Sequence, residues 1–176
     1  LKKDSFKMKK FIVETYYTCT FKTVHSLDNL NDQELSQILQ FCTKLRVLKL
    51  QNNNLRYPTF RRRYSYANYS LIDLNLQNNP SLINIDGFQD TCRYLISLTT
   101  EGTNLDKLPN WLSKVNTLSS LNIDGTTIIP ASLSKLTNLK DIRIDFPANR
   151  NFNNSLFNLR KASSIRISFY NVDDSD

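Results

Sequence analysis

The sequence predicts an α/β repeat solenoid, in which short parallel strands form one sheet and helices, 3₁₀ turns or loops form the opposite side. Three observations lead to this prediction. A leucine pattern of 11 positions recurs along the chain. The apolar residues inside the pattern alternate as they do in a strand. The segment before the first copy carries apolar residues at helical spacing. Self-similarity of this kind is the sequence signature of repeat architectures.

The repeated pattern is L-x-x-L-x-L-x-x-N-x-L, and residues 45–55 match it at every position. Later copies keep most of the apolar positions and vary the others. The copies begin at residues 45, 71, 95, 118, 139 and 162, at spacings of 26, 24, 23, 21 and 23. Copies in phase predict one repeat domain over residues 31–176, preceded by an N-terminal cap strand and loop over residues 1–30.

The pattern resembles the leucine-rich-repeat (LRR) protein family, with a mixture of typical and ribonuclease-inhibitor-like repeats. The resemblance covers residues 30–172. It implies an arc with a concave parallel β-sheet, one short strand per repeat, and helices, 3₁₀ turns or loops on the convex side. It also implies that the outward side chains of the concave sheet bind a partner.

The predicted strands follow from two apolar residues that lie two positions apart, such as Leu74 and Leu76, although Thr100 replaces the second of them in the third copy. Such residues share one face of a strand and point inward. Asn53 and Asn79 fall where the chain must turn away from the sheet, and their amides can bond the backbone groups that the turn leaves unpaired. The equivalent positions of the four later repeats hold Thr103, Thr126, Pro147 and Tyr170. The hydroxyls of the two threonines can replace the amide in part, whereas the last two repeats depart from the pattern.

The segments between the strands differ along the chain. An amphipathic helix is predicted before the first repeat from the stripe of Leu35, Ile38, Leu39 and Cys42. Asn31 and Glu34 have the spacing of a capping box at its start. Later segments are shorter, and Pro109 and Pro130 favour short helical or extended stretches there.

Both ends of the predicted solenoid need explanation. Residues 11–13 are apolar and predict the cap strand of the N-terminal segment. The last predicted strand is followed by no helix that would seal the core, although terminal repeats normally carry a polar cap. We therefore expect another chain or further sequence to cover the C-terminal edge.

Charge and cysteine content restrict the partners and the compartment. The net charge is +7, and residues 1–70 hold 13 Lys or Arg against 5 Asp or Glu. This excess is either a solubility surplus or the footprint of an anionic partner. Three cysteines, Cys19, Cys42 and Cys92, are too few for a disulfide framework and favour an intracellular over a secreted or surface location. No apolar run approaches the roughly 18 residues that a membrane-spanning helix needs.

The outward positions of the predicted sheet are the first candidate binding surface. One row holds Lys49, Asn75, Thr99, Asn122, Arg143 and Arg166, and a second row holds Gln51, Gln77, Glu101, Asp124, Asp145 and Ser168. The alternative is a solvated face with cross-strand pairs such as Arg143 with Asp124. A protein partner with complementary charge is the predicted occupant.

A basic and aromatic stretch over residues 56–70 is the second candidate. Its basic residues are Arg56, Arg61, Arg62 and Arg63, interleaved with Tyr57, Phe60, Tyr64, Tyr66 and Tyr69. Arginines bind phosphate through bidentate bonds, and aromatic rings stack on unpaired bases. The alternatives are packing of the rings in the core and binding of an acidic protein.

Nothing in the sequence predicts catalysis, a metal site or a cofactor. His25 is the single histidine and has no matched acid or nucleophile pattern, and 3 glycines are too few for a glycine-rich phosphate loop. The predicted function is a non-catalytic protein–protein interaction scaffold. The alternatives are a subunit of a ribonucleoprotein or other nucleic-acid assembly, and a secreted or cell-surface recognition domain.

Overall fold

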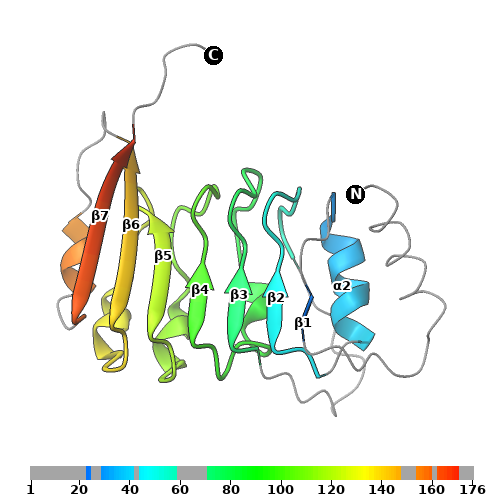
Figure 1. Cartoon of the computed structure of the whole chain (residues 1–176), viewed down its shortest axis with the longest axis horizontal. Helices are drawn as coiled ribbons and strands as arrows, with labels where there is room; N and C mark the ends of the chain where they lie inside the picture. The colour runs from blue at the N-terminus through cyan, green and yellow to red at the C-terminus, as the bar shows by residue number, and fades with distance from the viewer. Residues whose placement is uncertain are drawn as a thin grey trace.

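The computed structural model describes residues 23–24, 29–41, 44–58, 71–147, 154–159 and 162–170. Seven parallel strands form one sheet, and each strand pairs with its neighbours in chain order (Figure 1). The strands are β1 (Thr23–Val24), β2 (Val47–Lys49), β3 (Asp73–Asn75), β4 (Ser97–Thr99), β5 (Ser120–Asp124), β6 (Asp141–Pro147) and β7 (Ser164–Tyr170). This order is that of a repeat solenoid with one strand per turn.

The sheet pairs equivalent positions of successive repeats. One row of paired residues contains Val24, Leu48, Leu74, Leu98, Leu121, Ile142 and Ile165. The first strand of this row, β1, was not foreseen from the sequence. The cap strand predicted at residues 11–13 lies outside the described residues.

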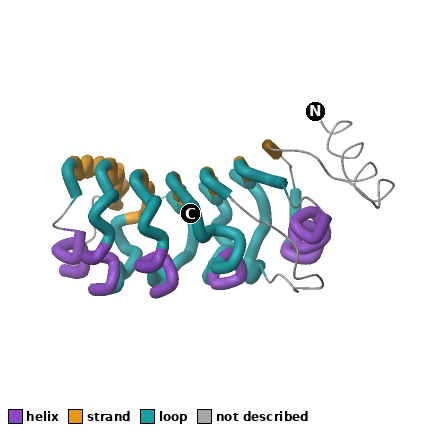
Figure 2. Tube along the Cα trace, turned by 90° about the horizontal axis from the view of Figure 1, so that it is seen from below, coloured by secondary structure: helices purple, strands orange, loops and turns teal. Residues whose placement is uncertain are grey.

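Helical turns cover one face of the sheet and leave the other face open (Figure 2). They are α2 (Asp32–Phe41) and the 3₁₀ turns η1 (Asp86–Phe88), η2 (Asn110–Lys114), η3 (Ala131–Lys135) and η4 (Asn154–Leu159). The strands lie in a shallow row in Figure 2, so the arc that the resemblance implied is only slightly curved. The physical reason is that 3₁₀ turns are thinner than α-helices and spread the far side of the stack less.

The predicted helix before the first repeat is confirmed. Glu34 N donates to Asn31 Oδ1 at 3.0 Å, and Asn31 N donates to Glu34 Oε2 at 3.1 Å. This reciprocal pair is the capping box that the sequence predicted. Leu35 of the predicted apolar stripe is buried. Farther along, Pro109 and Pro130 directly precede η2 and η3, in extended backbone, as expected.

The apolar core lies between the sheet and the helical turns, and leucines dominate it. Leu48, Leu74 and Leu98 have no exposed surface. No helix among the described residues is long and apolar enough to cross a membrane. Cys92 is also fully buried, and burial raises the pKa of its thiol to about 12. Cys19 and Cys42 lie outside the described part of the chain.

Buried amides close the turns after β2 and β3. Asn53 Oδ1 accepts from Leu30 N at 2.7 Å, and Asn53 Nδ2 donates to Leu50 O at 2.9 Å. Asn79 Oδ1 accepts from Leu55 N at 3.2 Å. Each amide therefore joins its own turn to the neighbouring repeat.

Threonines continue this ladder only in part. Thr103 Oγ1 donates to Thr100 O at 2.7 Å, as predicted. The prediction for Thr126 is wrong, because its side chain is exposed and the hydroxyl of Thr127 bonds Leu105 O at 3.2 Å instead. The sequence pattern is displaced by one residue at this turn.

The last two strands do not turn away where the earlier ones do. β6 and β7 stay paired as far as Pro147 and Tyr170, the positions where earlier repeats hold the turn asparagine. Phe146 is buried and stacks on Phe169, with 6.1 Å between ring centroids. Gly125 lies beneath Phe146 so closely that a Cβ atom there would overlap the ring.

Candidate protein-binding face

The open face of the sheet, the face opposite the helical turns, presents three rows of side chains. The middle row is Lys49, Asn75, Thr99, Asn122, Arg143 and Arg166, and these residues are direct neighbours across the strands. All six predicted residues are partly or fully exposed, and each of the strands β2 to β7 contributes one. The row starts with a cation at β2 and ends with two cations at β6 and β7.

The second predicted row does not form an exposed acidic column. Asp124 and Asp145 are only 9% and 5% exposed, so the expectation that both face solvent is wrong. Asp124 Oδ2 accepts from Gly102 N at 3.0 Å and from Thr103 N at 3.3 Å. The carboxylate of Asp124 thus satisfies backbone donors of the neighbouring turn, which requires it to lie against the sheet.

Glu101, Asp124 and Asp145 form a carboxylate cluster at the end of the open face. Burial raises the pKa of Glu101, and the nearby Asp145 carboxyl raises it further. Burial also raises the pKa of Asp124, which feels the charge of Asp145 as well. Asn122 Nδ2 donates to Glu101 Oε2 at 2.9 Å and partly offsets this effect. Glu101 and Asp124 therefore both lie close enough to Asp145 to feel its charge.

Arg143 is the cation that the structure brings to this cluster. Its Nε lies 3.4 Å from both carboxylate oxygens of Asp145 on the same strand. The cross-strand pair of Arg143 with Asp124 that the sequence suggested is therefore replaced by a pair within β6. The Arg143 side chain remains 58% exposed. Because of this exposure, the pair contributes little to stability, and the guanidinium keeps donors for another molecule.

A third row on the open face was missed in the sequence. It holds Val47, Asp73, Ser97, Ser120, Asp141 and Ser164, two positions before the middle row. The period of two along a strand was the signal that identifies it. A hollow of about 340 Å³ lies over the strands β4 to β7, and its lining includes Ser120, Asn122, Asp141, Arg143 and Arg166.

The basic and aromatic stretch can be placed only at its beginning. Arg56 and Tyr57 are exposed, and their backbone N–H groups donate to the two carboxylate oxygens of Asp32 at 3.0 and 2.7 Å. Arg61, Arg62, Arg63, Tyr64 and Tyr66 lie outside the described residues, as does His25. Within the described ranges, no group of three or more His, Cys, Asp or Glu side chains is arranged to hold a metal ion.

The fold has a solved counterpart. An internalin from Listeria monocytogenes, a leucine-rich-repeat protein, superposes with a TM-score of 0.56 at 19% sequence identity. The match covers 87% of this chain and 43% of the internalin, so the chain spans less than half the length of that protein. No family model matches the chain, and no curated protein sequence matches it either. The likeness in structure, together with the parallel sheet, shows that the chain has a repeat-solenoid fold similar to that of a leucine-rich-repeat protein.

Proposed function

We propose that this chain is a non-catalytic scaffold that binds a protein partner through the open face of its sheet. The observation that carries the proposal is the row from Lys49 to Arg166, in which six adjacent strands each present one polar or charged side chain. No helical turn among the described residues covers this face (Figure 2). A repeat scaffold offers an extended surface of this kind to a macromolecule rather than an enclosed pocket for catalysis.

The charges on this face favour a partner that carries both signs. Arg143 and Arg166 lie beside each other on β6 and β7, and the carboxylate cluster follows at the ends of strands β4 to β6. A partner with an acidic group above the arginines and a basic group above Glu101 would gain both contacts. A polyanion would gain the first contact and be repelled at the second.

The experiment is capture of a partner by the full chain, followed by titration of the purified partner against variants. Capture is carried out with and without nuclease, at low and high salt. Arg143→Ala with Arg166→Ala is expected to weaken binding by tenfold or more, on the order of a central arginine contact. The matched control is Lys135→Ala, which removes an exposed cation from η3 on the opposite side.

A nucleic-acid assembly is the second candidate, and it rests on the charge of the first 70 residues, 13 basic against 5 acidic. In that case capture requires nucleic acid, falls steeply with salt, and is lost in Arg61→Ala/Arg62→Ala/Arg63→Ala. Binding that survives nuclease and those three substitutions but fails in the Arg143 and Arg166 variant supports the open face. The reverse result contradicts it.

A further inference from the structure

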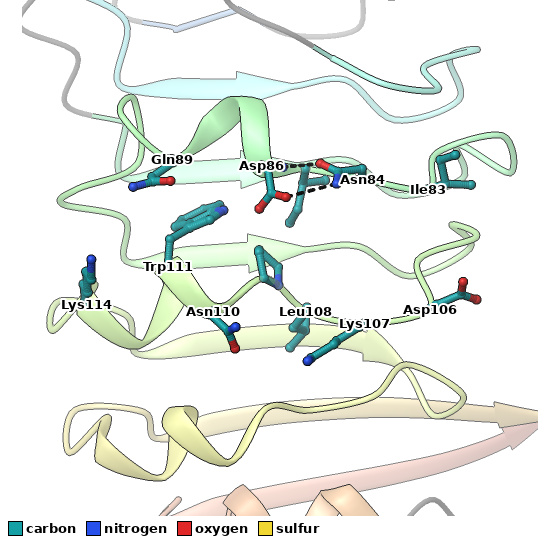
Figure 3. Close-up of a pocket in the computed structure, with 12 residues that line it drawn as sticks. Ile83, Asn84, Asp86, Gln89, Asp106, Lys107, Leu108, Asn110, Trp111 and Lys114 are labelled. Atoms are coloured by element: carbon teal, nitrogen blue, oxygen red, sulfur yellow. Dashed lines mark hydrogen bonds between the residues drawn. The ribbon is translucent and has the colours of Figure 1, made fainter.

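A groove opens on the side of the molecule that carries the helical turns, between residues 83–89 and 106–114 (Figure 3). Its volume is about 740 Å³, within the range of ligand-binding pockets, roughly 300–1,000 Å³. η2 packs against η3, and η3 against η4. η1 has only 3 residues where η2 and η3 have 5 each. The short η1 leaves the space beside η2 unfilled.

Backbone pairing between repeats is interrupted along this groove. On its far flank, Leu108 N donates to Ile128 O at 2.9 Å, and Ile128 N donates to Asp106 O at 2.7 Å. This parallel pattern turns the N–H and C=O of Lys107 away from Ile128 and towards the groove. Asn104 N donates to Leu82 O at 3.0 Å. Beyond that bond, no backbone hydrogen bond joins residues 83–89 to residues 105–114.

The flank at Lys107 therefore resembles the exposed edge of a sheet. Unpaired N–H and C=O groups along an edge are a template for an added extended chain, which gains affinity from main-chain hydrogen bonds. Backbone pairing between repeats continues outside the groove, where Ile83 N donates to Arg56 O at 3.2 Å and Ile128 bonds the backbone of Asp106 and Leu108.

Trp111 supplies an independent observation. Its side chain lines the groove and is only 6% exposed, yet its indole Nε1 has no hydrogen-bond acceptor. In Figure 3 the nitrogen lies on the side of the ring that faces Asp86. A buried donor without an acceptor is costly and uncommon in native proteins. The carbonyl of a ligand in the groove can supply the missing acceptor.

The charges of the groove define the ligand further. Asp86 and Asp106 contribute two negative charges, and Lys107 and Lys114 contribute two positive charges, so the lining is neutral overall. A nucleic acid would meet both carboxylates without a surplus of cations. A segment with little net charge meets no such penalty.

We propose that this groove binds an extended, net-neutral peptide segment of a protein partner. Peptide carbonyls accept hydrogen bonds from the Lys107 backbone N–H and the Trp111 indole N–H, and the side chains of the peptide pack beside the ring. This site lies on the opposite side from the open face, and it goes beyond the function proposed above.

The test uses phage-displayed random short peptides selected on the full chain. Selected peptides are synthesised and titrated by calorimetry and by the emission of Trp111, the single tryptophan of the sequence. Asn110→Phe fills the groove from an exposed position and is expected to abolish binding. Trp111→Phe keeps an aromatic ring, although a smaller one than the indole, and removes the N–H; it is expected to weaken binding about tenfold. Arg143→Ala on the open face is the control, with no change expected.

Several results would overturn the proposal. Selection yields no peptide that perturbs Trp111 emission, or Asn110→Phe binds the peptides as tightly as wild type. Loss of binding in Arg143→Ala places the peptides on the open face, and preference for single-stranded DNA over neutral peptides identifies the wrong ligand class. If Trp111→Phe leaves peptide affinity unchanged, the indole N–H does not bond the peptide, and the proposal fails at that contact. If the groove does not bind peptides, the test of partner binding by the open face is unaffected.

Discussion

The chain leaves the sheet in different ways in the early and in the late repeats. β2, β3 and β4 have 3 residues each, and the chain then turns. β6 and β7 have 7 residues each and pair along their full length. Asn53 and Asn79 bond the turning backbone of the early repeats. Pro147, at the same position of β6, has no side-chain donor or acceptor.

The two regions also differ in burial. Leu74 of β3 and Leu76, which directly follows that strand, are fully buried because repeats lie on both sides of them. Ile165 and Ile167 hold the same positions in β7 and are 44% and 43% exposed. The comparison shows that one inward position contributes to the core only when both neighbouring repeats are in place, as expected for a solenoid.

The largest expected effect is a charge at this inward position. Leu74→Asp places an unpaired carboxylate in the core and should cost about 4 kcal/mol or more, enough to unfold the chain. Ile165→Asp is the matched control and should cost less than about 1 kcal/mol, because the side chain is already half exposed. Circular dichroism and thermal denaturation measure both. Equal losses of stability would show that the two positions do not differ as described.

The second-largest loss of stability should come from removal of a side-chain amide that closes a turn. Asn79→Ala leaves Leu55 N and the carbonyls of Leu50 and Leu76 without this partner. Each buried group left unpaired costs about 1–3 kcal/mol, so we expect a total of about 2–4 kcal/mol in urea denaturation. Thr126→Ala, at the exposed equivalent position, should change stability by less than about 0.5 kcal/mol. A large loss of stability in Thr126→Ala would instead support the prediction that the Thr126 hydroxyl bonds the backbone of its turn.

The contact of Gly125 with Phe146 marks the junction between the two regions. Gly125→Ala forces the ring to move and should cost about 1–3 kcal/mol. Phe146→Leu creates room, so the double variant should lose less stability than the sum of the two single variants. Additive losses would mean that the added methyl group does not meet the ring.

The smallest expected effect is a dependence of stability on pH that comes from Asp124. The early repeats, whose turns are closed by asparagines, lack this dependence. Burial raises the pKa of Asp124 above its ordinary value of 3.8. An acid with a raised pKa binds its proton more tightly in the folded state, so its contribution to stability is present at low pH and is lost as pH rises through the folded pKa. Asp124→Asn keeps an acceptor for Gly102 and Thr103 and removes this loss. Parallel stability profiles of the two proteins from acid to neutral pH would contradict this.

Local patterns predicted the regular part of the molecule well. The capping box of Asn31 and Glu34 depends on residues three apart, and the inward leucines depend on a period of two, so both can be recognised within one repeat. The open-face row from Lys49 to Arg166 follows from the same period. Its role in binding remains our proposal.

Other features depend on which repeats lie side by side, and the sequence alone does not show them. Asp124 is an outward position by its period, but it is buried because the neighbouring turn presents two N–H groups to it. Arg143 pairs with Asp145 rather than Asp124 for the same reason. The groove beside Trp111 exists only because a short turn, η1, lies next to a longer one.

The sequence by itself determined the repeat, its phase and the inward leucines, because these are set by hydrophobic periodicity along a single strand. Tertiary structure decided which polar side chains are exposed and where the carboxylates lie together. It also decided where a groove forms on the side of the helical turns. Those properties arise from contacts between residues more than 20 positions apart, such as Asn79 with Leu55 and Asp124 with Gly102. Their energies depend on desolvation by neighbouring repeats, which no single repeat encodes.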